Sequence, residues 1–215
     1  MSTLHFRLAV FDLDGTLKTV RDPYVYLHRR LGVAEEGEAL IARGKAGQLS
    51  YEEWLRADAL LWRGAQRSQL EQWLRQIPYL PGAREALARL SEAGLQIAII
   101  SAGLLLHAEL VANEADIDHI FANEIFFEDL GGGEVVSGEV RAHVSYRGKG
   151  AVLDCLQAEL GISPAETIAL GDTRGDIPLF ERAAFSVAVR PNHPEVAAAA
   201  DIVLQDLTDL WRLVG

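Results

Sequence analysis

The chain has 215 residues, of which 49% are hydrophobic and 24% charged, the composition of an ordinary globular protein rather than a disordered or fibrous one. Its 31 acidic and 20 basic residues give a formal net charge of −11. This charge argues against nucleic acid as a partner, because such binders need clustered positive charge. No apolar run approaches the ~20 residues that span a bilayer, so we expect no membrane partner. The first ten residues lack the pattern of a signal peptide, and a single cysteine excludes an intrachain disulfide, so we expect a cytoplasmic protein.

Short apolar runs alternate with amphipathic segments along the chain. The runs are continuous rather than alternating, which suits strands that are covered on both faces, as in a parallel sheet. The alternation of such strands with helices predicts a doubly wound, mostly parallel α/β sheet with a Rossmann-like core. The expected strands are 6–11, 96–100, 167–170, 185–189 and 202–204. The expected core helices are 82–93, 104–113 and 151–160, with a loop or hairpin at 130–140 and a capping box at 163–166.

One segment breaks this alternation. Some sixty residues without a convincing strand separate the first strand from Gly82, although a parallel crossover needs only about a dozen. Three of the four tryptophans lie in this segment. We predict that residues 18–78 form a helical cap inserted into a core of residues 1–17 and 79–215. The helical patches of this cap are 24–31, 36–47, 51–62 and 68–76.

Polar residues directly follow three of the predicted strands. Asp12, Ser101 and Asp172 each stand where an apolar run ends. Ligands of open α/β sheets bind beyond the carboxyl ends of the strands, so we expect these side chains to lie at one site. The histidines show no metal-ligand spacing, and we expect His107 to pack within its helix rather than to act in catalysis.

Asp12 and Asp14 form a pair of carboxylates two residues apart. If the strand stays extended through Asp14, both side chains point to the same side. Two close carboxylates do not both ionise easily without a cation nearby, so the pair suggests a metal site, or one nucleophile and one proton donor. A turn rich in acidic residues is the plain alternative. An EF-hand also begins with this pattern, but it needs a glutamate where this chain has Pro23.

Four further residues carry chemistry that suits an anion or a cation. Ser101 precedes a helical segment, where it is either an N-cap or, with free backbone amides, part of an anion site. Lys149 stands at the start of a helix, against the helix dipole, which a bound phosphate would explain; a solvated lysine in a glycine loop is the alternative. Asp172 and Asp176, together with Asp12, suit a shared hard cation, and Mg²⁺ prefers such oxygen ligands.

The ordered motifs FDLDGTL, IISAG, a lysine in GKG, and GDxxxD resemble the four signature motifs of the haloacid dehalogenase superfamily. The helical cap after the first motif is similar to that of its phosphoserine phosphatase-like branch. The resemblance implies a Mg²⁺-dependent phosphomonoesterase that hydrolyses a small phosphorylated metabolite through an aspartyl-phosphate. Whether the protein is a monomer or a homodimer stays open.

The resemblance also implies a role for each motif residue. Asp12 would be the nucleophile and Asp14 the general acid and base. The implied phosphate ligands are Ser101, the Ala102 amide and Lys149. The implied Mg²⁺ ligands are Asp12, the Asp14 carbonyl and Asp172, with Asp176 supporting them.

Competing functions differ in what they require. A dehalogenase would need neither Asp14 nor a metal. A receiver-like module, a non-enzymatic phosphoacceptor of signalling, would be shorter, would lack a cap, and would carry its aspartate on a later strand. A phosphotransferase that passes the phosphoryl group to an alcohol remains an alternative to a hydrolase.

The substrate is less clear than the reaction. Phosphoserine phosphatases typically supply a glutamate shortly after the first motif and an arginine from the cap, but the first glutamate here is Glu35. They usually carry asparagine where this chain has Gly175. The cap offers Arg43, Arg56 and Arg63 as carboxylate partners without selecting one. We therefore expect a small phosphate ester or sugar phosphate other than phosphoserine.

Overall fold

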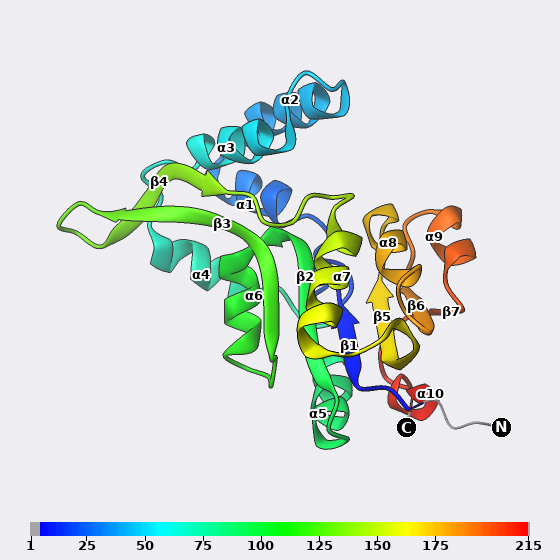
Figure 1. The fold of residues 1–215 in the computed structure, drawn as a ribbon. Coiled ribbons are helices and arrows are strands. Elements are labelled where there is room, and N and C mark those ends of the chain that lie inside the picture. Colours follow the sequence, from blue (N-terminus) through cyan, green and yellow to red (C-terminus); the bar gives the residue numbers. More distant parts are fainter. Residues whose placement is uncertain (1–4, 215) are drawn as a thin grey trace.

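A computed structural model describes residues 5–214 of the chain. Its centre is a seven-stranded sheet in the order β4-β3-β2-β1-β5-β6-β7, in which only the pair β3–β4 is antiparallel (Figure 1). The strands are β1 (Leu8–Phe11), β2 (Gln96–Leu104), β3 (His119–Asp129), β4 (Glu134–Arg141), β5 (Thr167–Gly171), β6 (Phe185–Val189) and β7 (Ile202–Leu204). The expected doubly wound α/β fold is confirmed.

Helices cover both faces of the sheet. Helices α5 and α6, with residues 207–210, pack on one face, and α7, α8 and α9 pack on the other. The core helices are α5 (Ala83–Glu92), α6 (Leu105–Ala112), α7 (Lys149–Leu160), α8 (Ile177–Phe180), α9 (Pro194–Ala199) and α10 (Trp211–Val214), with short 3-10 turns η1 (Pro164–Glu166) and η2 (Arg174–Asp176). No helix in the described part of the chain is both long enough and apolar enough to cross a bilayer.

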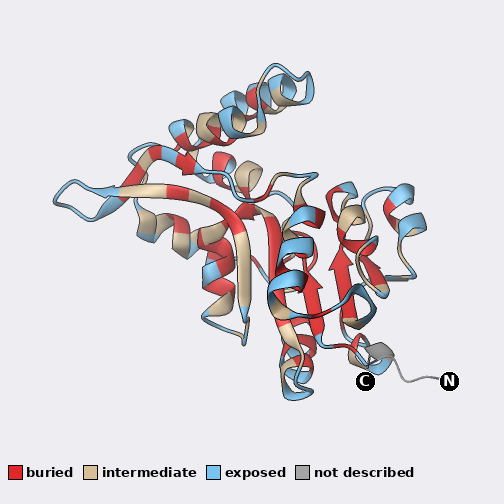
Figure 2. Ribbon diagram, viewed as in Figure 1, coloured by how far each residue is buried: buried red, intermediate tan, exposed pale blue. Residues whose placement is uncertain are grey.

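Strand β1 shows why the apolar runs are continuous. Its four residues are fully buried, and alternate side chains enter different packing layers. Ala9 and Phe11 belong to the layer under α5, whereas Leu8 and Val10 belong to the layer under α7. Figure 2 shows the same pattern, with buried residues along the central strands and exposed ones on the outer sides of the helices.

Four helices separate β1 from α5, as the sequence predicted: α1 (Pro23–Leu31), α2 (Ala34–Lys45), α3 (Tyr51–Leu61) and α4 (Arg67–Arg75). Helix α1 begins after Asp22, whose side chain accepts a hydrogen bond from the Val25 amide. Helix α3 begins with a capping box between Ser50 and Glu53. We call these four helices the cap; its exact boundaries at 18 and 78 stay a prediction.

The structure differs from the sequence-based prediction at β2 and β3. Strand β2 continues through Ser101 to Leu104, and its register with β3 shifts between Ile100 and Leu104. Strand β3 was not predicted. Its first half pairs with β2 in the parallel sheet, and its second half pairs with β4 as an antiparallel hairpin, so that it curves away from the sheet towards cap helices α3 and α4, which pack against β4 (Figure 1). The loop or hairpin expected at 130–140 is this hairpin.

Candidate active site

The polar residues that follow the strands do gather at the carboxyl edge of the sheet. Asp12 follows β1 and its amide donates to the Leu170 carbonyl of β5 over 2.9 Å, which holds it beside the end of that strand. Asp172 follows β5. The site residues expected from the sequence are all buried, each 5% exposed or less: Asp12, Asp14, Ser101, Lys149, Asp172 and Asp176.

Lys149 joins two of the carboxylates. Its Nζ lies 2.6 Å from Asp12 Oδ1 and 2.6 Å from Asp176 Oδ1. Burial opposes its charge, but the two carboxylates outweigh burial and raise the pKa of Lys149 above its ordinary value. The unfavourable position of a cation at the start of α7 is thus explained by two buried ion pairs.

Three carboxylates have oxygens within 4.8 Å of one another, those of Asp12, Asp172 and Asp176. Burial raises the pKa of Asp12 to about 7; Lys149 opposes this rise, while Asp176 and Asp14 add to it. Burial, followed by Asp12 and Asp176, raises the pKa of Asp172 to about 9. The Lys149 ammonium and the Arg21 guanidinium, whose Nε lies 3.2 Å from Asp172 Oδ2, supply two positive charges against three carboxylates, so the cluster favours an additional cation.

The free oxygens of this cluster belong to Asp172. Both its carboxylate oxygens are buried without a hydrogen-bond partner among the described residues, although Arg21 Nε forms an ion pair with Oδ2 at 3.2 Å. The Asp176 carboxylate already has hydrogen-bond partners, because its Oδ2 accepts from the Asp172 amide and from both the amide and the hydroxyl of Thr173. The oxygen-only donor set and the orphaned Asp172 carboxylate fit a hard divalent cation.

Asp14 contacts the end of β2 and helix α6. Its Oδ2 is 3.4 Å from the Ser101 hydroxyl, and its Oδ1 is 2.9 Å from His107 Nδ1. A methyl group at Gly103 would collide with the Asp14 carboxylate, so the close approach requires glycine there. Gly15, at φ 96°, turns the chain away after Asp14.

His107 is a residue of the site that sequence reasoning missed. It is fully buried on α6, as expected for a packing residue, but it contacts Asp14. A lone histidine in an apolar helix carries no spacing signal, and only the approach of α6 to the first motif reveals the contact.

The three cap arginines do not join this group in the structure. Arg56 pairs with Glu139 of β4 at 2.8 Å, Arg63 is exposed beside Gly138, and Arg43 is exposed on α2. Two other cap residues do reach the site: the hydroxyls of Tyr24 and Tyr51 both donate to the Ala102 carbonyl.

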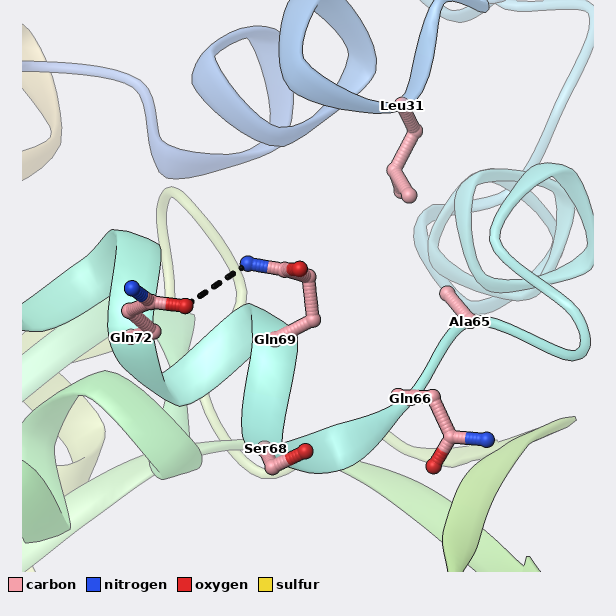
Figure 3. Close-up of a pocket in the computed structure, with 6 residues that line it drawn as sticks. All are labelled: Leu31, Ala65, Gln66, Ser68, Gln69 and Gln72. Carbon is pink, nitrogen blue, oxygen red and sulfur yellow. Dashed lines mark hydrogen bonds between the residues drawn. The ribbon is translucent and has the colours of Figure 1, made fainter.

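A separate pocket of about 420 Å³ lies in the cap, between the end of α1 and the start of α4 (Figure 3). It contains no ionisable side chain and shares no residue with the acidic cluster, so it offers no chemistry to the site. Its lining is Leu31, Ala65, Gln66, Ser68, Gln69 and Gln72.

A buried lysine between aspartates at the carboxyl edge of a parallel sheet, under a helical cap, defines a class of hydrolase. The family model of haloacid dehalogenase-like hydrolases matches residues 9–181, and the chain belongs to this family. Within it the chain is a phosphatase of the phosphoserine phosphatase-like branch, so the resemblance drawn from the motifs is confirmed.

The chain is similar along most of its length to proteins named as phosphoserine phosphatases. The chain is 28% identical over 212 residues to a probable phosphoserine phosphatase of Schizosaccharomyces pombe, covering 97% of this chain and 70% of that protein. It is 27% identical over 211 residues to the phosphoserine phosphatase of Methanocaldococcus jannaschii, covering 97% of both chains. The solved structure of a phospho-aspartyl intermediate analogue of phosphoserine phosphatase superposes with a TM-score of 0.80 at 26% identity, covering 98% of this chain and 100% of that one.

Proposed function

We propose that the protein is a Mg²⁺-dependent phosphomonoesterase that hydrolyses a small phosphorylated metabolite through an aspartyl-phosphate on Asp12. The observation that carries the proposal is the buried set of Asp12, Lys149 and Asp172 at the strand ends. Together with Asp176, the carboxylates of the cluster outnumber the cations Lys149 and Arg21, and the Asp172 oxygens have no hydrogen-bond partner among the described residues. When bound at Asp12 and Asp172, with the Asp14 carbonyl as a further ligand, Mg²⁺ supplies positive charge that offsets the repulsion between a carboxylate and a phosphate.

The residues of the site divide the reaction between them. An oxygen of Asp12 attacks phosphorus, a new bond forms between them, and the ester bond to the leaving alcohol breaks. Asp14 gives its proton to the departing alkoxide and then takes a proton from the water that attacks the aspartyl-phosphate. Lys149, Ser101 and the Ala102 amide hold the phosphoryl oxygens, where charge develops in the transition state. Water attack frees inorganic phosphate and restores the Asp12 carboxylate.

The residues near the first motif favour a substrate other than phosphoserine. An amino-acid substrate brings an ammonium group that needs a carboxylate partner. Here the one carboxylate shortly after the first motif, that of Asp22, is engaged as the N-cap of α1, where it accepts a hydrogen bond from the Val25 amide. At Gly175 a side chain would meet the Tyr146 carbonyl, because its first carbon would lie 2.8 Å away. These features support a phosphate ester whose alcohol carries no amino-acid group.

The test is a panel of phosphorylated metabolites that includes L-phosphoserine, assayed with Mg²⁺ and with EDTA for released phosphate and released alcohol. We expect equal amounts of both products, only with the metal, and no tenfold preference for phosphoserine in kcat/KM. Asp12→Asn should abolish turnover with the fold intact, and exposed Asp209, which pairs with exposed Arg212, provides Asp209→Asn as the matched control. An excess of alcohol over phosphate when an alcohol acceptor is added would indicate transfer rather than hydrolysis.

A further inference from the structure

Three side chains converge on the carbonyl oxygen of Ala102, in the irregular end of β2. Tyr51 Oη of α3 lies 3.0 Å from this oxygen, Tyr24 Oη of α1 lies 3.3 Å away, and Asn123 Nδ2 of β3 lies 2.9 Å away. Two of these three donors come from the cap and one from the core. A backbone carbonyl that accepts three hydrogen bonds from three separate elements is fixed in direction.

The hydrogen bonds of Asn123 determine the orientation of its side-chain amide. It is fully buried, and its Oδ1 accepts from the amides of His143 and Val144 at 2.9 and 3.0 Å, so its Nδ2 must face the Ala102 carbonyl. The same Nδ2 also lies 2.8 Å from Tyr51 Oη and 3.0 Å from the Val144 carbonyl oxygen, so its two protons are shared among three acceptors. Because a carbonyl oxygen can only accept, the hydrogen bond between Tyr51 and Ala102 uses the Tyr51 proton.

The Ala102 carbonyl shares a planar peptide unit with the Gly103 amide. Because the two groups of a trans peptide point in opposite directions, holding the carbonyl towards the cap aims the Gly103 N–H the other way. That N–H donates to the Ser101 hydroxyl oxygen over 3.0 Å. Because this oxygen accepts from Gly103, its own proton is directed to an acceptor on the other side, which in the structure is Asp14 Oδ2 at 3.4 Å and under the proposed function is a phosphoryl oxygen.

The cap presents the two hydroxyls from rigid positions. Tyr24 lies in the first turn of α1, and its ring stacks on Trp62 with centroids 5.7 Å apart and planes 22° apart. Tyr51 is the first residue of α3, directly after the N-cap Ser50. Burial raises the pKa of Tyr51 to about 12, which keeps its hydroxyl protonated, and therefore a donor, at neutral pH.

We propose that Tyr24 and Tyr51 are positioning residues of the phosphate site, which act through the Ala102–Gly103 peptide on the Ser101 hydroxyl and so complete that site only when the cap is seated on the core. The proposal rests on the proposed function for the role of Ser101. It adds that two cap hydroxyls, which need not touch the substrate, set the geometry of a core group that does.

The experiment compares Tyr24→Phe, Tyr51→Phe and the double variant with a matched control, Tyr26→Phe. Tyr26 also donates its hydroxyl to a backbone carbonyl, that of Trp73, but this contact lies within the cap. Turnover of the best substrate of the panel, affinity for orthovanadate in the presence of Mg²⁺ and melting temperature are measured for each protein. We expect kcat to fall about 3- to 10-fold for each lost hydroxyl, with a smaller change in KM. Vanadate affinity should fall by a similar factor, and the melting temperatures should stay close to that of Tyr26→Phe.

A second comparison isolates the path through Ser101. In a Ser101→Ala background, Tyr51→Phe should lower kcat and vanadate affinity by less than twofold, because the group that the tyrosine aligns is gone. An undiminished effect in that background would overturn the proposal. So would a double tyrosine variant that matches Tyr26→Phe in both kcat and vanadate affinity, or one that loses only thermal stability. Vanadate binding is measured without turnover, so it tests the positioning role even if no phosphate ester proves to be a substrate.

Discussion

Removal of the Lys149 ammonium should destabilise the protein by an amount that its two contacts predict. Lys149→Met keeps most of the buried side-chain volume but leaves Asp12 and Asp176, each formerly 2.6 Å from Nζ, without their cation. Breaking a buried ion pair by removing one partner costs about 3–5 kcal/mol. With an unfolding entropy of about 2.1 cal/mol/K per residue, a chain of this length loses roughly 7–11 °C in melting temperature for that cost.

The measurement is a thermal melt in EDTA, so that no divalent cation replaces the lost charge. Lys45→Met is the matched control, because Lys45 is an exposed lysine at the end of α2 and should change the melting temperature by about 1 °C or less. A Lys149→Met/Asp176→Asn double variant should recover part of the loss, since it buries one uncompensated carboxylate fewer. A loss of less than about 2 °C for Lys149→Met, or a double variant less stable than Lys149→Met alone, would refute the electrostatic account.

Three further predictions concern single contacts. Gly103→Ala should cut kcat at least tenfold with little change in melting temperature, because the added methyl collides with the Asp14 carboxylate; wild-type turnover would contradict that geometry. His107→Ala should lower kcat about tenfold or more, with a larger loss on alkyl phosphates than on p-nitrophenyl phosphate, and His107→Asn should restore part of it by keeping a donor towards Asp14. Glu166→Gln should lower stability at pH 7, because hydrogen bonds from Ser163 hold the pKa of Glu166 at about 2. That stability is present above the unfolded value near 4.5 and is lost as the pH falls towards 2, so the melting curves of the two proteins should converge in acid, and a gap independent of pH would argue against it.

The central strands were predictable because their surroundings are uniform. Strands β1, β5 and β6 are covered on both faces, so their sequences are continuous apolar runs. Strand β3 passes through two surroundings: it lies inside the parallel sheet near Phe121 and reaches solvent at Glu128. No single period describes such a strand, which is why the sequence did not reveal it.

The residues of the candidate active site show the same limit of prediction from sequence. Asp12 and Asp172 could be placed together from sequence because the carboxyl ends of parallel strands share one edge. His107, Tyr24 and Tyr51 meet the site through the packing of α6, α1 and α3 on it, and no fixed spacing along the chain encodes that approach. Residues on strand ends are therefore predictable, and residues that arrive by helix docking require the structure.

The curved β3–β4 hairpin has a consequence for protein engineering. The outer edge of β4 is closed by the cap backbone, through hydrogen bonds of 2.9 Å from the Gly64 amide to the Val136 carbonyl and from the Val136 amide to the Ala65 carbonyl. Excising the cap would leave an open strand edge and would remove the cap half of the apolar cluster that contains Ile125 and Val140, the combination that promotes edge-to-edge aggregation. A chimera with a different cap should therefore exchange the β3–β4 hairpin together with the cap helices, because the hairpin and the helices share backbone hydrogen bonds and one apolar cluster.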